Sequence, residues 1–376
     1  MNNSLIYTKR YSNNIFIIVN EKLLTYIRCP LCKSDLIFEA HNKETASVNK
    51  NVFITGIFSC DCGMIYPMVH NIPRLLPESF LDYETIIDNF IPDYHKIKQA
   101  IMHKYSSLIS DSRKNNNTVK RTFGFEWSLL KDNKQVNIWN LTKKEFEQQL
   151  WDELKIPAEE LKHMIVADVG CGHGRSGSLM ADKSYTVFCM DVGLSIEEAA
   201  ANNQKDNCFF LQADLHYLPF EDNLFDLVYS SGVLHHTPDT EAAFKKVSRV
   251  VKSKGTYCIW LYHPFNNLIH KTMLALRYIT IYLPIRIQFW LYMIFLLPFH
   301  KLVSFIKGNK KGWREIMINQ LDMLSPKYRH EHNAAEVINW YKKNNFTDVE
   351  ITTSNTYGFS IKGRKDSINV KSGSLK

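Results

Sequence analysis

The stretch from residue 161 to residue 262 restricts the fold of this chain most, because short apolar runs alternate there with helical patterns. Between the last two runs lies EAAFKKVSRVV, whose apolar residues follow helical spacing, with Gly255 after it as a stop signal. Strands that alternate with helices predict an α/β fold with a doubly wound, mostly parallel, Rossmann-like sheet. In such a sheet the ligand binds at the carboxyl ends of the strands. The apolar runs are MIVAD, TVFCM, CFFLQ, FDLVYS and TYCIWLY.

The turn after the first apolar run is rich in glycine and reads DVGCGHGRSG. Gly172, Gly174 and Gly177 fit the G-x-G-x-x-G pattern of dinucleotide-binding turns. Asp168 followed by Gly170, Gly172 and Gly174 fits D-x-G-x-G-x-G instead. The apolar run ends at Asp168, so Gly170 is the glycine nearest the strand, which favours the second pattern. Glycine suits this turn because the backbone bends sharply and lies close to the ligand.

Two acidic residues follow the next two apolar runs. Asp191 comes after the second run, where a carboxylate can accept hydrogen bonds from both hydroxyls of a ribose. Asp214 comes after the third run, where it can accept from an adenine amino group. The stretch LPFEDNLFDLV then leads into the fourth run, and a nicotinamide enzyme has no reason to carry it.

These segments together resemble the class I S-adenosylmethionine-dependent methyltransferases, in particular the group that includes the ubiquinone/menaquinone-type enzymes. The resemblance covers about residues 161–262 and departs from the family at VKSKG, where a Pro-Gly-Gly turn is usual. It implies S-adenosylmethionine as cofactor and methyl donor. The segments that carry it are VADVGCGHG, MDVG, ADLHYLPFEDNLFDLVYSSGVLHH and RVVKSKGTYCIW.

The resemblance also implies roles for residues at the ends of the first four strands. Asp168 would organise the loop, and the three glycines after it would line the methionine part. Asp191 would bind the ribose, Asp214 the adenine amino group, and Leu215 would pack on the adenine ring. Ser230 would face the methyl group. The cofactor-binding residues predicted in this way are Asp168, Gly170, Gly172, Gly174, Asp191, Asp214, Leu215 and Ser230.

The segment after the fourth strand, SSGVLHHTPD, bears on the methyl acceptor. It lacks the Asn/Asp-Pro-Pro-Tyr and Pro-Cys elements typical of enzymes that methylate nucleobases. His235 and His236 are candidate catalytic bases, and the alternative is that one packs beside the cofactor while the other faces solvent. A second polar cluster lies in SPKYRHEH and would bind an anionic or hydroxylated substrate, unless it is simply an exposed loop. Its candidate substrate-binding residues are Tyr328, Arg329, His330 and His332.

The N-terminal part contains RCPLCKSDL followed by FSCDCGMIYPMVHNIPRLL, at about residues 27–77. It resembles the small zinc-ribbon family related to the activator subunit of tRNA methyltransferases. Four thiolates from two turns form a tetrahedral zinc site, so we expect Zn²⁺ as a second cofactor, with a metal-free ribbon of the same fold as the alternative. The second cysteine pair is one residue tighter than the usual C-x-x-C. The predicted metal ligands are Cys29, Cys32, Cys60 and Cys62.

The chain of 376 residues is long enough for several domains. The interval DSRKNNNT at 111–118 reads as an exposed linker. The element RTFGFEW at 121–127 resembles an FG-x-EW element of some methyltransferases, in which Phe123, Glu126 and Trp127 would belong to a lid; a hydrophobic anchor is the alternative. We expect a flexible tail at 1–26, a zinc-ribbon-like domain at 27–78, a helical linker and lid at 79–160, a methyltransferase domain at 161–364 with an apolar insertion at 266–325, and a disordered tail at 365–376.

The segment YITIYLPIRIQFWLYMIFLLPF at 278–299 is just long enough to span a membrane, which needs about 20 apolar residues. Arg286 near its middle and Pro284 disfavour spanning, and a crossing here would split the strands of one sheet. We favour a buried helix that roofs the acceptor pocket. The alternative is peripheral contact with a membrane. Basic residues that support this alternative are Lys271, Arg277, Lys301, Lys307, Lys310, Lys311 and Arg314.

The composition is that of an ordinary globular protein, with 45% hydrophobic and 22% charged residues. The net charge of +8 would suit nucleic acid, phosphorylated substrates or anionic lipid, and alone selects none of them. The cysteine pattern and the absence of a secretory signal predict a cytoplasmic protein, associated with membrane if the second reading of 278–299 holds.

The leading hypothesis is methyl transfer to a small-molecule, glycan or lipid-like acceptor. An RNA methyltransferase whose ribbon contacts RNA is an alternative, although nucleic acid is the less favoured partner. A non-catalytic scaffold that binds a partner protein is a further alternative, against which the intact cofactor motif argues. The sequence leaves the oligomeric state open.

Overall fold

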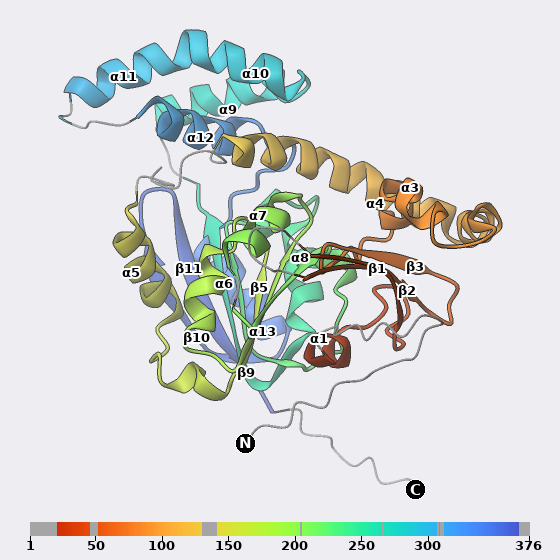
Figure 1. Cartoon of the computed structure of the whole chain (residues 1–376). Coiled ribbons are helices and arrows are strands. Elements are labelled where there is room, and N and C mark those ends of the chain that lie inside the picture. Colours follow the sequence, from red (N-terminus) through yellow and green to blue (C-terminus); the bar gives the residue numbers. More distant parts are fainter. Residues whose placement is uncertain are drawn as a thin grey trace, which may run out of the picture. The chain divides into compact units, whose positions relative to one another are not determined.

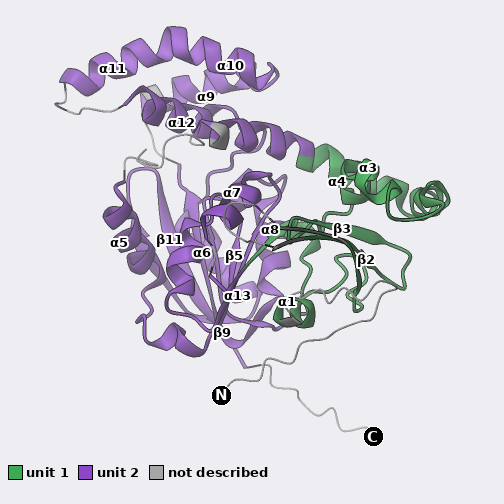
Figure 2. Cartoon of the chain, viewed as in Figure 1, with its two compact units in different colours: residues 1–116, 209–221 green, residues 117–208, 222–376 purple. Residues whose placement is uncertain are grey.

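The computed structural model describes residues 21–45, 52–129, 141–203, 205–264, 267–306, 308 and 312–367. The chain divides into two compact units, coloured separately in Figure 2. Unit 1 comprises residues 1–116 and 209–221, and unit 2 comprises residues 117–208 and 222–376. Each unit is described by itself below.

Unit 1 is built on a small antiparallel sheet in the order β1-β2-β3-β4. Phe58 of β2 is paired with Tyr66 of β3, and both side chains are fully buried. The sheet confirms the small N-terminal β domain expected from the sequence. The elements of this part are α1 (Glu21–Tyr26), β1 (Ile37–Thr45), β2 (Val52–Ser59), β3 (Ile65–Val69), β4 (Ile72–Pro73), α2 (Ser79–Asp82), α3 (Glu84–Asp88) and the first part of α4 (Tyr94–Ser128).

The larger sheet has seven strands in the order β10-β11-β9-β8-β5-β6-β7. Strand β5 is parallel to both of its neighbours, β6 and β8, and β9 is parallel to β8. Strands β10 and β11 form an antiparallel hairpin on β9. This is the mostly parallel, Rossmann-like sheet that the sequence predicts. The strands are β5 (Ile165–Val169), β6 (Thr186–Asp191), β7 (Cys208–Gln212), β8 (Phe225–Ser231), β9 (Val251–Tyr262), β10 (Phe346–Ser354) and β11 (Gly358–Lys365).

The strand order reverses at β5, since the chain goes from β5 to β6 on one side and returns to β8 on the other. In open α/β sheets ligands bind at such a switch point, outside the carboxyl ends of the strands. The glycine turn follows β5 and the two histidines follow β8, so both predicted motifs belong to this point.

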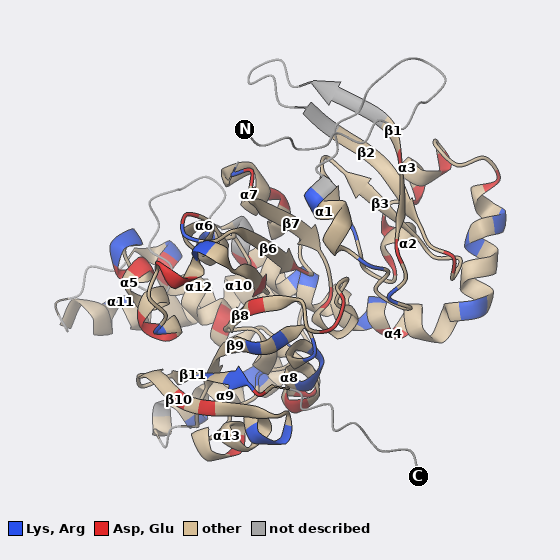
Figure 3. Cartoon of the chain, turned by 90° about the horizontal axis from the view of Figure 1, so that it is seen from below, with Lys and Arg blue, Asp and Glu red and all other residues tan. Residues whose placement is uncertain are grey.

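Helices cover both faces of the sheet in unit 2. Figures 1 and 3 show α6 and α7 on one face and α8 with α13 on the other. The ring of Phe244 on α8 lies 4.7 Å from that of Tyr341 on α13, and the Tyr341 hydroxyl donates to the Tyr257 carbonyl of β9. The helices are α5 (Lys143–Leu154), α6 (Arg175–Ala181), α7 (Ser195–Asn202), α8 (Thr240–Ser248) and α13 (Ala334–Lys343).

The insertion after β9 forms a separate helical layer, with α10 and α11 as its outermost part in Figure 1. A π-helical turn, Tyr292–Leu296, joins these two helices. Tyr292 and Leu297 pack against α12, in a small core that includes Met317 and Leu321. The helices of this layer are α9 (Leu268–Thr280), α10 (Ile285–Leu291), α11 (Leu297–Ile306) and α12 (Trp313–Leu324).

By length and composition, Ile285–Ile306 could cross a membrane, with a mean hydropathy of 1.7 in its most apolar window. Only 11% of that window is buried. The expectation of a buried helix is therefore wrong for this stretch: one face packs on α12, while the opposite face is left uncovered within the described residues.

Three local expectations also need correction. Residues 111–118 are not an exposed linker but part of α4, where Ser112 and Asn116 are buried. Gly255 does not end a helix, since α8 stops at Ser248 and Gly255 lies within β9. The last residues of the predicted N-terminal tail form α1, with Leu23 buried. Residues 1–20 and 368–376 and the Trp127 side chain lie outside the described part.

Candidate functional site

The glycine turn after β5 has backbone conformations that side-chain-bearing residues rarely adopt. Gly170, Gly172 and Gly174 have φ of +79°, +52° and +72°. A Cβ on Gly170 would lie 2.3 Å from Cγ2 of Val233, in the loop after β8. Gly170 therefore has a packing reason to be glycine, in addition to any contact with a ligand.

Asp191 at the end of β6 is joined to the glycine turn. Its Oδ2 accepts a hydrogen bond from the Gly172 N–H at 3.0 Å, and its Oδ1 accepts from the Gly193 N–H at 2.7 Å. Burial raises the pKa of Asp191, and these two N–H groups lower it. A carboxylate has about four acceptor positions, so Asp191 can still accept from two ribose hydroxyls. This geometry fits S-adenosylmethionine.

Asp168 at the end of β5 is almost fully buried. Burial raises its pKa to about 7, against the opposing effect of the Gly177 N–H. A Cβ on Gly177 would lie 2.1 Å from the sulfur of Cys189, so this glycine lets α6 pack closely on β6. Gly177 thus has a packing role. Its presence does not depend on the G-x-G-x-x-G dinucleotide pattern, which the position of the strand end disfavours.

Ser230 at the end of β8 is fully buried, and its hydroxyl donates to the Val169 carbonyl of β5 at 2.9 Å. This hydrogen bond therefore connects β8 to β5 at the switch point. The next residue, Ser231, donates at 3.2 Å to Glu153 of α5. These contacts give Ser230 a structural role, and its place beside the methyl group stays a prediction.

Glu153 is a buried carboxylate that the sequence analysis missed. It accepts hydrogen bonds from Tyr229 at 2.8 Å and from Gln149 at 2.6 Å, besides the one from Ser231. Burial raises its pKa, and these donors lower it. No motif surrounds Glu153 in the sequence, so only the helix packing identifies it.

Asp214 and Leu215 belong to unit 1, at the end of β7. Oδ1 of Asp214 accepts from the His216 N–H at 2.8 Å and also lies 2.8 Å from Nδ1 of the same histidine. Burial alone would raise the pKa of Asp214, but the contacts with His216 outweigh it and hold the pKa below its usual value. Asp214 is therefore ionised and suited to accept from an amino group, and Leu215 beside it is partly exposed.

His236 is the best-defined of the candidate bases. Its Nδ1 lies 2.9 Å from the Tyr328 carbonyl oxygen, and its Nε2 lies 4.0 Å from Oδ1 of Asp322 on α12. Burial lowers the pKa of His236 to about 4, although Asp322 opposes this shift. The ring also makes an edge contact with Phe123 of α4, with centroids 5.1 Å apart.

His235 has a different environment. Its ring is fully buried, and within the described part of the chain neither ring nitrogen has a hydrogen-bond partner. Its centroid lies 4.3 Å from those of both His236 and Tyr262, and 5.8 Å from that of Trp260. Burial holds its pKa well below the usual value. His235 therefore packs as a neutral aromatic residue, which makes His236 the favoured candidate base.

The segment predicted to bind substrate lies against these histidines. The Arg329 guanidinium lies over the Tyr262 ring at 4.1 Å and pairs with Glu331. Glu331 in turn lies 2.7 Å from Nε2 of His270 on α9. The Tyr262 hydroxyl donates to Oδ2 of Asp322 at 2.6 Å. A buried network of charged and polar groups thus connects β9, α9 and α12.

Glu126 of the predicted lid faces the same network and is 1% exposed. Burial and the nearby negative charge of Asp322 raise its pKa well above the usual value. Burial near Asp322 therefore favours the neutral form of the Glu126 carboxyl group. Neither Asp322 nor Glu331 has a local sequence signal, because their partners come from distant segments.

A small hollow opens beside His236. It brings together Phe123 from the predicted lid, His236, and Tyr328 from the predicted substrate-binding segment. His330 and His332 instead bond to scaffold groups, the Thr237 carbonyl at 3.1 Å and Glu336 at 3.1 Å. The residues lining the hollow are Thr118, Val119, Thr122, Phe123, His236, Pro326, Lys327 and Tyr328.

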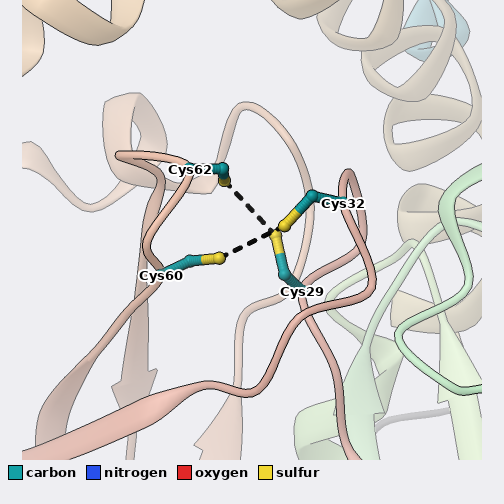
Figure 4. A group of neighbouring side chains, drawn as sticks. All are labelled: Cys29, Cys32, Cys60 and Cys62. Carbon is teal, nitrogen blue, oxygen red and sulfur yellow. Dashed lines mark hydrogen bonds between the residues drawn. The ribbon is translucent and has the colours of Figure 1, made fainter.

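The four predicted metal ligands converge in unit 1 (Figure 4). Their sulfur atoms all lie within 4.8 Å of one another, with 3.7 Å between Cys29 and Cys62 and 3.3 Å between Cys32 and Cys60. Sulfur atoms around tetrahedral zinc lie about 3.8 Å apart, given Zn–S bonds of about 2.3 Å. The tight second pair therefore does not prevent convergence, and the group fits Zn²⁺.

Comparison with known proteins agrees with the fold. A family model described as a methyltransferase domain matches residues 167–259. Cycloartenol-C-24-methyltransferase 1 of Oryza sativa subsp. japonica is 32% identical over 122 residues, covering 29% of this chain and 35% of that protein. Sterol 4-C-methyltransferase strm-1 of Caenorhabditis elegans is 28% identical over 113 residues, covering 28% and 33%. The chain thus spans about a third of the length of these relatives.

Among solved structures, magnesium protoporphyrin IX methyltransferase (ChlM) from Synechocystis PCC 6803 aligns with 67% of this chain and 100% of its own, with a TM-score of 0.42 and 16% identity. The family match overlaps the segment that carries the sequence motifs and the strands from β5 to β9. Residues 167–259 therefore match a methyltransferase domain, inside the segment whose motifs resemble the class I S-adenosylmethionine-dependent methyltransferases.

Proposed function

We propose that this chain transfers a methyl group from S-adenosylmethionine to a small, largely apolar, lipid-like acceptor. The observation that carries the proposal is His236, a buried neutral imidazole beside a hollow that aromatic side chains border. The relatives named for sterol methylation support an apolar acceptor.

On the donor side, Asp191 would accept from the ribose hydroxyls while it keeps its two backbone N–H partners. The backbone of Gly172 and Gly174 would follow the methionine part. Asp214 and Leu215 would hold the adenine. When bound, S-adenosylmethionine supplies an activated methyl group with a neutral leaving group, so the protein needs mainly to position the acceptor.

On the acceptor side, His236 would remove a proton from the nucleophile. Its Nδ1 is held by the Tyr328 carbonyl, so Nε2 is the nitrogen that can accept. The imidazolium formed would be stabilised by the negative charge of Asp322, 4.0 Å away. Phe123 packs against the ring and fixes its orientation.

Methylation of RNA remains the competing function. Figure 3 shows Lys and Arg distributed over α4, α8 and β9. Several pair with acidic residues, such as Lys98 with Glu84 and Arg249 with Asp222. Paired and dispersed cations offer less to a phosphate backbone than a continuous basic strip would.

The test is to incubate the purified full chain with S-adenosylmethionine labelled in the methyl group and with a cell extract. The extract is then separated into neutral lipid, glycan, small-molecule and RNA pools. We expect the label in the neutral lipid or apolar small-molecule pool, and none there with the His236→Gln variant. Label in RNA would establish the competing function, and label in no pool would contradict the proposal.

A further inference from the structure

The outer face of α10 and α11 carries a continuous row of exposed apolar side chains. Several are more than half exposed, including Trp290 at 61%, Phe295 at 67% and Phe305 at 82%. Monomeric soluble proteins rarely expose large contiguous apolar patches, and such patches mark interaction sites. We call this row the apolar stripe: Ile287, Trp290, Ile294, Phe295, Phe299, Leu302, Phe305 and Ile306.

The π-helical turn keeps the apolar stripe on one face. Ile287 and Trp290 of α10 and Ile294 within the turn follow α-helical spacing. Phe295 within the turn and Phe299, Leu302 and Ile306 of α11 follow the same spacing, shifted by one residue. A π turn inserts one residue into a helix, which accounts for the shift. Figure 1 shows that the two helices continue in one direction.

The opposite face of these helices packs against other helices of the same chain. Tyr292 is buried, and its hydroxyl donates to Oγ1 of Thr280 on α9 at 2.9 Å. Leu297 belongs to the same core as Met317 and Leu321 of α12. A spanning helix would have to leave these contacts, whereas a helix lying in the plane of a bilayer surface would keep them.

The chain segment that contains the apolar stripe carries charge of a single sign. Between residues 263 and 312 the sequence has seven Lys or Arg residues and no Asp or Glu. Of these, Lys271, Arg286 and Lys301 are exposed. Trp290 is of the type that prefers the membrane–water interface. An apolar face with flanking cations complements anionic headgroups, whereas a second copy of this chain would bring the same positive charge.

We propose that the apolar stripe binds the surface of an anionic lipid bilayer, with α10 and α11 lying in the interface plane. Such a surface would bring the protein to a bilayer in which lipid-like acceptors are dissolved. The binding itself does not depend on the methyl-transfer function proposed above.

The experiment is co-sedimentation of the full chain with phosphatidylcholine vesicles, with and without phosphatidylglycerol. We expect binding to the anionic vesicles at low salt and weaker binding as salt is added, because the cations are screened. The double variant Trp290→Ser/Phe295→Ser should bind at least about tenfold more weakly, since two large apolar side chains no longer enter the interface. Ile351→Ser, which changes an exposed apolar residue on β10, is the matched control and should bind as wild type does.

A second variant guards against misfolding of the first. Arg286→Glu/Lys301→Glu changes only exposed charges and should also weaken binding to anionic vesicles. The proposal is overturned if the wild-type protein stays in the supernatant with every vesicle, or if neither double variant changes binding. A dimer in sedimentation velocity that Trp290→Ser/Phe295→Ser abolishes, without vesicle binding, would make the stripe a self-interface. Methylation of a detergent-solubilised extract tests the proposed function separately.

Discussion

Nδ1 of His236 lies 2.9 Å from the carbonyl oxygen of Tyr328, a residue 92 positions later in the chain. A carbonyl oxygen only accepts hydrogen bonds, so Nδ1 carries the proton of the neutral ring. The lone pair is therefore on Nε2, the nitrogen nearer to Asp322. One backbone contact thus selects the tautomer that a general base needs.

Replacement of His236 by Gln should lower methyl transfer by about 10²- to 10⁴-fold, which is the usual contribution of a general base. Affinity for S-adenosylmethionine, measured by calorimetry, should stay unchanged because His236 has no predicted contact with the donor. The neighbouring substitution His235→Phe is the control and should keep most of the activity, since that ring packs as an aromatic side chain. Equal losses in both variants would show that the pair has only a structural role.

The buried histidines should make stability depend on pH. Folding lowers the pKa of His235 and His236, so below about pH 6.5 the unfolded chain binds protons that the folded chain does not. Their contribution is present above that pH and is lost as the pH falls toward the folded pKa, about 4 for His236. Each such histidine changes the free energy of unfolding by at most about 1.4 kcal/mol per pH unit.

Urea unfolding of wild type and His235→Phe at several pH values checks this dependence. The variant lacks one of the two histidines, so it should lose less stability than wild type between about pH 6.5 and 5. Buried acids such as Asp168 titrate in both proteins and cancel in the difference. Parallel stability curves would refute the assignment of His235 as a buried neutral ring.

Asp191→Asn should weaken S-adenosylmethionine binding by about tenfold to a hundredfold, because charge-assisted hydrogen bonds to the ribose are lost. The matched substitution Asp222→Asn removes an acid that pairs with Arg249 at the surface, and it should leave the affinity unchanged. Calorimetric titration of both variants provides the measurement. Wild-type affinity in Asp191→Asn would remove Asp191 from the site.

Purified protein should contain about one equivalent of zinc, bound by the four converging cysteines. Cys62→Ser should reduce the metal content and the thermal stability, and strong chelators should reduce both in wild type. Cys258→Ser, at a buried cysteine of β9, should leave the metal content unchanged. Elemental analysis measures the zinc content of each protein. Less than about half an equivalent of zinc in unchelated wild-type protein would favour a metal-free ribbon.

Several elements could be predicted from the sequence because their signals are local. The apolar runs at β5, β6, β7 and β8 match the observed strands within a residue or two, since each run is bounded by its own turn residues. The cysteine pairs converge because each pair lies in a tight turn. Helix α4 through residues 111–118 was not predictable, because a polar, Asn-rich stretch favours a loop unless tertiary contacts hold it. There Ser112 and Asn116 both donate to buried Glu78.

The sequence by itself determined the order of strands and helices, the glycine turn after β5, the acid after β6 and the four-cysteine group, because periodicity and turn chemistry act over a few residues. Only the tertiary structure decided what those groups do to one another. It separated His235 from His236 by giving one ring an aromatic surrounding and the other a backbone acceptor. It raised the pKa of Glu126 by burying this side chain near Asp322, and it left the apolar stripe exposed. The burial and charge of a side chain depend on neighbours that are distant in the chain. The hydropathy of a helix does not predict which of its faces those neighbours cover.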